Sequence, residues 1–162
     1  MNKNTIIPIF GQEVLEKEVT FELDGQVVDA HEGETIWQVA KREGIDIPHL
    51  CWRDENGYRS DGNCRACMVE IEGERTLAAS CCRKVGGGLV VNTNNDRVRT
   101  NRKLVFELLA SDMPSRKTGP DPDASFWHHA ESVGLGDSPR FEGSRPAAKS
   151  NIPVDSIFRD VS

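Results

Sequence analysis

The chain has 162 residues, of which 37% are hydrophobic, and its formal net charge is −6 at pH 7. This length is enough to bury one core and to carry one appended segment. The acidic balance argues against nucleic acid and anionic membrane surfaces as partners, since both are negatively charged. No apolar run approaches the length of a transmembrane span. The apolar patch near the N-terminus is interrupted by Pro8 and Gly11 and is too short for a secretion signal.

Residues 1–17 are predicted to form an irregular N-terminal arm. The alternation of apolar and polar residues over Val19–Leu23 predicts the first strand. Asp24-Gly25 is typical of a two-residue hairpin turn, so the second strand is predicted at Gln26–Ala30.

A short helix is predicted after this hairpin. Thr35 and Gln38 have the spacing of a capping box, and Gly44 is suited to end the helix in a left-handed conformation. The predicted inner face of this helix consists of Ile36, Val39 and Ala40. The chain then runs extended to Cys51.

The remainder of the domain is predicted to contain a second hairpin, a strand and a longer helix. The hairpin joins Met68–Ile71 to Thr76–Ala79, and the strand is Leu89–Val91. The helix is predicted from about Asp96 to Ser111, with N-cap candidates just before it. Its predicted inner face consists of Val98, Val105, Leu108 and Leu109. Hairpin, helix, loop, hairpin, strand and helix in this order predict an α+β fold of the β-grasp type over residues 18–112.

Residues 113–162 differ in composition, because six of the eight prolines lie there. The segment is predicted to be a mostly irregular tail. Its spaced aromatic residues, among them Phe126 and Trp127, suggest docking on a surface of this chain or of a partner.

All five cysteines lie between Cys51 and Cys82. Twelve residues separate Cys51 from Cys64, two separate Cys64 from Cys67, and thirteen separate Cys67 from Cys81. Grouped thiols without a secretion signal favour a metal or redox site in a reducing compartment, so a cytoplasmic location is expected.

Three chemistries compete for these thiols. Structural zinc is often bound by two paired C-x2-C motifs, whereas this chain has only one. A thioredoxin-like pair would use Cys64 and Cys67 alone and leave Cys51 and Cys81 without a role. A [2Fe–2S] cluster takes four thiolates and tolerates one distant ligand. The spacing favours the cluster, and a zinc-stabilised binding module without a redox role is the alternative. A metal-free ubiquitin-like module would give the four thiols no purpose.

The residues around the close pair support a cluster. Gly62-Asn63-Cys64-Arg65-Ala66-Cys67 is small or polar beside both thiols. Small residues let backbone N–H groups approach sulfur and donate hydrogen bonds to it, which raises the reduction potential of a cluster.

Three stretches resemble a known family: Gly44 to Cys51, Gly62 to Glu70, and Ser80-Cys81. They are similar to the N-terminal [2Fe–2S] domain of NADH-quinone oxidoreductase 75 kDa-type subunits, NAD-reducing hydrogenase subunits and the alpha subunit of NAD-dependent formate dehydrogenases. The resemblance covers about residues 19–112. Glu107 to Pro114 resembles the formate dehydrogenase branch more than the respiratory one.

The resemblance implies a 2Fe-2S ferredoxin-like domain whose cluster ligands are Cys51, Cys64, Cys67 and Cys81. It implies an iron–sulfur subunit or fragment that relays single electrons within an NAD-linked oxidoreductase. The expected partners are flavin/NAD-binding subunits and molybdenum- or tungsten-pterin subunits. In the family, further cluster motifs usually follow this domain, but no cysteine follows Cys82 here. We therefore expect no catalytic site in this chain.

Four residues near the cysteines have predicted roles outside ligation. His49 is predicted to lie beside the cluster or at the surface, because a Rieske-type site needs a second histidine at matching spacing. Trp37 is predicted to pack in the core and Trp52 to cover the cluster. Cys82 is predicted to point away from the irons, because adjacent residues on an extended segment face opposite sides.

Overall fold

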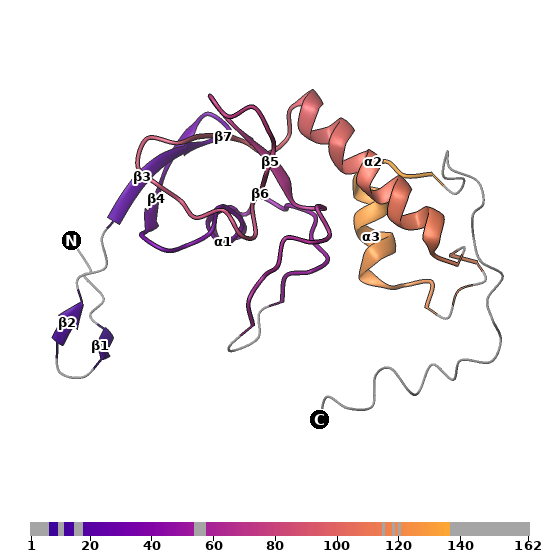
Figure 1. Cartoon of the computed structure of the whole chain (residues 1–162), viewed down its shortest axis with the longest axis horizontal. Helices are drawn as coiled ribbons and strands as arrows, with labels where there is room; N and C mark the ends of the chain where they lie inside the picture. Colours follow the sequence, from indigo (N-terminus) through magenta and orange to yellow (C-terminus); the bar gives the residue numbers. More distant parts are fainter. Residues whose placement is uncertain are drawn as a thin grey trace.

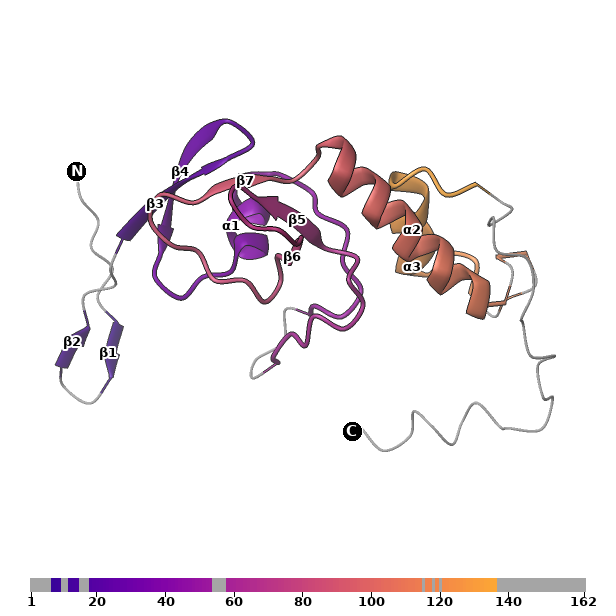
Figure 2. The same cartoon turned by 45° about the horizontal axis from the view of Figure 1, so that its top comes forward.

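The computed structural model describes residues 7–9, 12–14, 18–53, 58–114, 116, 117, 119 and 121–136. Two short strands, β1 (Ile7–Ile9) and β2 (Gln12–Val14), pair antiparallel near the N-terminus. They form a separate sheet, which lies away from the main sheet in Figures 1 and 2. The prediction of an irregular arm is therefore wrong for these two strands.

The main sheet has five strands in the order β4-β3-β7-β5-β6. They are β3 (Glu18–Leu23), β4 (Gln26–His31), β5 (Met68–Ile71), β6 (Ala78–Ala79) and β7 (Val90–Asn92). Strands β3 and β7 are parallel, and every other neighbouring pair is antiparallel. Helix α1 (Ile36–Arg42) lies against this curved sheet (Figure 1). This is the β-grasp arrangement, so the predicted α+β fold is confirmed.

Local sequence signals explain the first half of the domain. Asp24 and Gly25 both have positive φ angles, 50° and 83°, as a two-residue hairpin turn requires. The Thr35 side chain accepts from the Gln38 backbone N–H, and the Gln38 side chain accepts from the Thr35 N–H. This reciprocal capping box starts α1 at the predicted place.

One hydrophobic core lies between the sheet and α1. Of the inward positions predicted for β3, Phe21 and Leu23 are buried and Val19 is partly buried. The inner face of α1 is buried as well. The fully buried residues of this core include Leu23, Ile36, Val39, Val69, Ile71 and Val91. The predicted strand Thr76–Ala79 is shorter than expected, because the turn after β5 extends to Leu77 and leaves only Ala78–Ala79 as β6.

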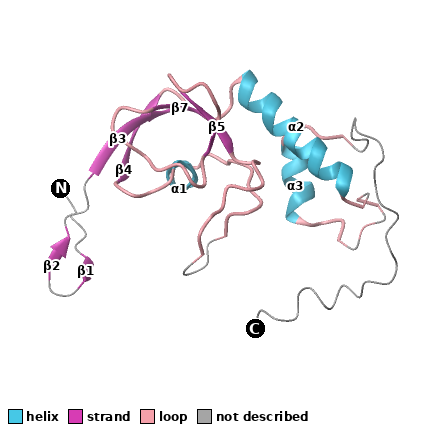
Figure 3. Ribbon diagram, in the orientation of Figure 1, coloured by secondary structure: helices cyan, strands magenta, loops and turns pink. Residues whose placement is uncertain are grey.

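Helices α2 (Asp96–Asp112) and α3 (Ser125–Ser132) pack beside each other next to the sheet (Figures 2 and 3). Their contact is a second apolar cluster, formed by Ala66, Phe106, Ala110, Phe126 and Ala130. The prediction of an irregular tail from residue 113 is therefore wrong for residues 125–132. Phe126 and Ala130 are four residues apart, so they lie on one helical face and bury it against α2. None of the described helices is long and apolar enough to cross a membrane.

The inner face of α2 differs in part from the prediction. Val98 is fully buried as expected, but Leu108 is 54% exposed. The buried face continues in four-residue steps from Val98 through Arg102 to Phe106 and Ala110. Leu108 lies two residues beyond Phe106, roughly 200° around the helix axis, and therefore faces outward.

Candidate metal centre

All five cysteines lie outside the helices and strands, in the segments that Figure 3 colours as loops and turns. Cys51 lies in the loop after α1, Cys64 and Cys67 directly precede β5, and Cys81 follows β6. Met68 of β5 pairs with Ala79 of β6, so the close pair and the distant cysteine meet at the same strand ends. One antiparallel hairpin thus makes neighbours of Cys67 and Cys81, which are separated by thirteen residues in the chain.

The N-terminus of α1 fixes the segment that carries Cys81. The backbone N–H groups in the first turn of a helix have no partner within the helix. In this structure Ile36 N–H donates to the Arg83 carbonyl at 2.9 Å, and Trp37 N–H donates to the Ser80 carbonyl at 3.1 Å. These two bonds flank Cys81 and Cys82 and hold both residues against the helix end.

The four predicted ligand sulfurs form two pairs. The Cys51 and Cys64 sulfurs are 3.3 Å apart. The Cys81 thiol donates a hydrogen bond to the Cys67 sulfur, and this bond lowers the pKa of Cys67 to about 6. The same bond, together with burial, raises the pKa of Cys81 far above its usual value. A metal that binds here needs both sulfurs as thiolates and must displace the protons that they carry.

Backbone N–H groups surround the other sulfur pair. Burial acts to raise the pKa of Cys51, but hydrogen bonds from Cys64 and from the Gly62 backbone lower it overall. Burial raises the pKa of Cys64, against a hydrogen bond from the Ala66 N–H. Donors of this kind stabilise sulfur that carries negative charge, as thiolate ligands of a cluster do.

Burial differs among the five cysteines. Cys67 and Cys81 are almost fully buried, Cys51 and Cys64 are partly exposed, and Cys82 is exposed. The Cys82 sulfur donates to the Ser60 carbonyl at 3.3 Å and lies 3.7 Å from the Cys81 sulfur. It also lines an open hollow of about 850 Å³, together with Cys81, Trp52 and Tyr58. Cys81 and Cys82 lie in a turn and not on an extended strand, so the alternation of side chains does not separate their sulfurs. That Cys82 is not a ligand stays a prediction.

Gly62 allows the loop to pass close to Cys82. Its φ angle is +67°, in the left-handed region that favours glycine. A Cβ atom at this position would lie 3.1 Å from the Cys82 sulfur. The glycine before the C-x2-C pair is therefore required for both backbone conformation and space.

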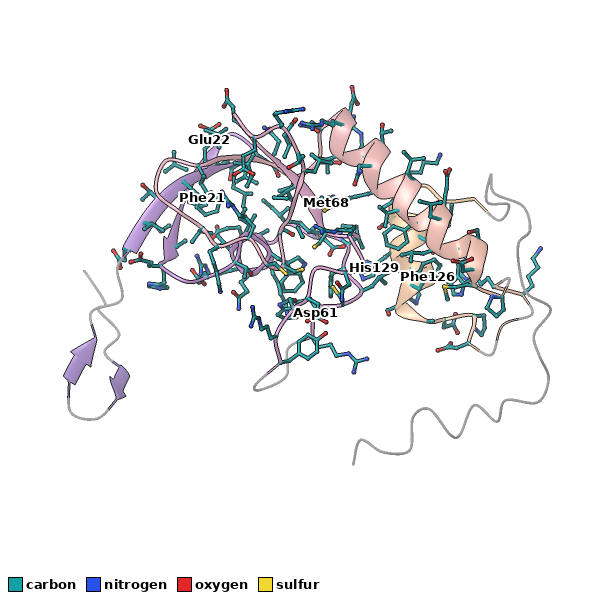
Figure 4. All side chains as sticks on the ribbon, viewed as in Figure 1. Phe21, Glu22, Asp61, Met68, Phe126 and His129 are labelled. Atoms are coloured by element: carbon teal, nitrogen blue, oxygen red, sulfur yellow. The ribbon has the colours of Figure 1, made fainter. Side chains whose placement is uncertain are left out.

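Aromatic side chains hold the loop that carries Cys51. Trp37 is 4% exposed and donates from Nε1 to the Ile47 carbonyl at 3.1 Å, so its predicted core position is confirmed. Trp52 stacks on Trp37 beside Cys51. The His49 Nδ1 atom lies 3.2 Å from the Ile47 carbonyl, and its ring contacts Trp37 and His129. His49 therefore supports the loop and contacts α3, on which Figure 4 labels His129.

The donor set fits a two-iron cluster better than one metal ion. Four sulfurs in two pairs, each pair reached by backbone N–H groups, match two irons with two thiolates each. A structural zinc ion would need all four sulfurs around one centre.

The family comparison distinguishes between the two metals. The model of the 2Fe-2S iron-sulfur cluster binding domain matches residues 16–96 of this chain. The chain belongs to this family. It is therefore a [2Fe–2S] protein, as the cysteine spacing favoured, and the zinc alternative is not supported.

Similar proteins share this domain. The chain is 36% identical, over 88% of its length, to "NADP-reducing hydrogenase subunit HndD" from Solidesulfovibrio fructosivorans, of which it spans 25%. It is 37% identical, over 60% of its length, to "NADH-ubiquinone oxidoreductase 78 kDa subunit, mitochondrial" from Candida albicans, of which it spans 13%. The crystal structure of an NAD+-reducing [NiFe]-hydrogenase in the H2-reduced state has a TM-score of 0.67 at 28% identity, covering 79% of this chain and 53% of that one.

These matches confirm the resemblance to NADH-quinone oxidoreductase and hydrogenase subunits. The chain spans a quarter or less of the hydrogenase subunit and of the 78 kDa subunit. None of these three proteins is named as a formate dehydrogenase subunit.

Proposed function

We propose that Cys51, Cys64, Cys67 and Cys81 ligate the [2Fe–2S] cluster and that the chain relays single electrons. The observation that carries this proposal is the arrangement of the four sulfurs in two pairs, of which the β5–β6 hairpin brings Cys67 and Cys81 together. When bound, the cluster supplies a centre that gains and loses one electron. The protein holds it with thiolates and backbone N–H donors and needs no substrate pocket.

The burial of the cysteines supports electron exchange with a partner. The Cys67 and Cys81 sulfurs lie against the core, whereas Cys51 and Cys64 are partly exposed. A centre with one buried side and one side near the surface is held rigidly and stays close to a docked redox partner. The two proposed sulfur pairs therefore differ in their distance from solvent.

We propose that this relay operates within an NAD-linked oxidoreductase assembly. The names of the similar proteins include NAD+, NADH or NADP, and the chain corresponds to only a part of each. We propose that other subunits or domains carry out the substrate chemistry. The relay exchanges electrons with two partners, and we expect a flavin/NAD-binding component to be one of them.

As the second electron partner we propose the molybdenum- or tungsten-pterin component of a formate dehydrogenase-like assembly. The support is the resemblance of Glu107 to Pro114 to that branch. A hydrogenase assembly is the second candidate, because the similarity to the hydrogenase subunit covers 88% of this chain and includes the region beyond α2. We also propose a cytoplasmic location, since all five cysteines are free thiols.

Metal analysis of the native assembly distinguishes the two branches. The chain is tagged in its own host, and the complex is purified anaerobically under mild conditions. Molybdenum or tungsten in the complex, with reduction of the cluster by formate, supports the formate branch. Reduction of the cluster by hydrogen gas and not by formate, without molybdenum or tungsten in the complex, supports the hydrogenase branch and overturns the formate proposal. Untagged host extract passed over the same resin is the control.

A further inference from the structure

Arg102 is a buried arginine on the side of α2 that faces the cysteine loop. It is 6% exposed, and both its Nε and Nη2 atoms donate to the Met68 carbonyl, at 3.0 Å and 2.8 Å. Met68 directly follows Cys67 and begins β5. Figure 4 shows Met68 between the main sheet and α2. The guanidinium group is therefore anchored one residue away from a proposed cluster ligand.

The charge of Arg102 is not neutralised by an ion pair among the described residues. The other arginines in the first half of α2 are more exposed and are paired, Arg97 with Glu70 and Arg99 with Asp96. Within the described part of the chain, the hydrogen-bond partner of Arg102 is a neutral carbonyl. Burial lowers its pKa to about 10, so the group stays protonated at neutral pH. A buried cation without a counter-ion is unfavourable unless negative charge lies nearby.

A bound metal centre places negative charge beside Arg102, because the Met68 residue that accepts its hydrogen bonds directly follows the proposed ligand Cys67. Asp24 and Asp46 are two further negative groups that favour the charged guanidinium. Four thiolates and two sulfides outweigh the charge of two ferric ions, so an oxidised [2Fe–2S] centre is already an anion. Reduction adds one further negative charge at the same place. A fixed buried cation favours the reduced form more than the oxidised form.

We propose that the buried positive charge of Arg102 raises the reduction potential of the cluster, although Arg102 ligates no metal. This inference rests on the proposed ligation by Cys67, but it does not depend on which complex the chain serves. Because the charge is removed from water, it is weakly screened and acts on the centre more strongly than the surface arginines do.

The test compares midpoint potentials of four proteins that carry the cluster. Arg102→Gln removes the charge and keeps an N–H donor near the Met68 carbonyl, whereas Arg102→Lys keeps the charge. Lys103→Gln is the matched control, because Lys103 is the next residue of the same helix and is exposed. Each protein is titrated anaerobically with redox mediators, and the reduced cluster is followed by EPR.

We expect Arg102→Gln to lower the equilibrium constant for reduction about tenfold, which corresponds to about 59 mV for one electron. Arg102→Lys should retain most of the wild-type potential, and Lys103→Gln should leave it unchanged. A potential in Arg102→Gln equal to that of the wild type would overturn the proposal. An equal fall in Arg102→Lys would also overturn it, because the loss would then follow from geometry and not from charge.

A cluster that fails to load in the variant is a separate outcome. Arg102→Met provides a second uncharged side chain, and reconstitution with ferrous iron and sulfide supplies loaded protein if cells do not. If neither uncharged variant holds a cluster while Arg102→Lys does, Arg102 only holds the loop and the tuning role is wrong. Iron analysis of the wild type tests the cluster itself, so failure of ligation and failure of tuning give different results.

Discussion

The indole ring of Trp37 stacks on that of Trp52, with 3.9 Å between ring centroids and 32° between ring planes. Trp37 belongs to the buried face of α1, and Trp52 follows Cys51. Lys41 of the same helix lies over both rings, at 5.3 Å and 5.0 Å from their centroids. This contact joins α1 to a loop that has no regular structure of its own. Together with the α1 N–H groups beside Cys81, it makes α1 the support for two of the four proposed ligands.

We expect Trp52→Ala to leave the fold intact and to make the cluster less resistant to air. The stack contributes roughly 0.5–1.5 kcal/mol beyond burial, and its loss frees the Cys51 loop. The visible absorbance should therefore decay several-fold faster after exposure to oxygen. Trp52→Phe, which keeps an aromatic ring on Trp37, is the matched control. Equal decay rates in Trp52→Ala and wild type would show that the stack does not protect the centre.

Gly62→Ala is expected to destabilise the protein more than Gly73→Ala. Both glycines have positive φ angles, +67° and +82°, so alanine costs about 1–2 kcal/mol at either position. Only at Gly62 would the new Cβ lie 3.1 Å from the Cys82 sulfur, whereas Gly73 has open space. Thermal unfolding of the two variants measures the difference. Adding Cys82→Ala to Gly62→Ala should restore most of the stability that Gly62→Ala loses beyond Gly73→Ala. If the double variant is no more stable than Gly62→Ala, contact with the Cys82 sulfur is not the cause of the extra loss.

Helix α3 should protect the cluster, although it lies beyond the predicted domain boundary. Phe126 and Ala130 cover Phe106 and Ala110 of α2, and Cys64 and Leu50 pack at the edge of the same apolar cluster. Truncation after Asp112 would expose this surface and should speed the loss of iron to a chelator. Truncation after Gly136 keeps α3 and is the control. If both truncated proteins lose iron at the wild-type rate, α3 has no protective role.

The contact between α3 and the cysteine loop should weaken in acid. Burial lowers the pKa of His129, and the neighbouring His49 lowers it further. The unfolded state therefore binds a proton at higher pH than the folded state, so stability falls as the pH drops below the unfolded value of about 6.5. His129→Gln should show a smaller loss in melting temperature between pH 7.5 and pH 5.5 than wild type. The exposed His31, which is not among the charges that act on His129, is changed to Gln as the control, and this variant should behave as the wild type.

The sequence predicts most of the β-grasp domain because its signals are local. The Asp24-Gly25 turn, the Thr35 capping box and the alternation along β3 each depend on residues close together in the chain. Each of these signals can therefore be recognised without knowing how the rest of the chain folds. The placement of the cysteines also follows from a hairpin that the sequence predicts.

Helix α2 is predicted almost to its observed bounds, whereas α3 and its packing on α2 are not, because their signals are tertiary. The prolines at 114, 120 and 122 suggested an irregular tail, but they end before α3 begins at Ser125. The burial of Arg102 could not be inferred from periodicity, since an arginine in a helix is normally assigned to the outer face. Only the position of the Met68 carbonyl explains it. Polar groups that are buried for a specific partner are the residues that pattern analysis places wrongly.

Cys81 and Cys82 provide the sharpest test of the ligand assignment, because they are adjacent and differ in exposure. Cys81→Ser replaces a thiolate with a poorly matched oxygen and should shift the spectrum or abolish the cluster. Cys82→Ser should leave iron content and spectrum nearly unchanged, since its sulfur points toward Ser60 and the open hollow. Loss of the cluster in Cys82→Ser, with retention in Cys81→Ser, would show that the assignment is off by one residue.

The most direct measurement is the iron, zinc and acid-labile sulfide content of the anaerobically purified wild-type chain, with an EPR spectrum after reduction by dithionite. We expect two irons and two sulfides per chain, as four thiolates in two pairs require, and a signal from a reduced [2Fe–2S] centre. One zinc per chain without sulfide, in protein expressed with added iron, would contradict it.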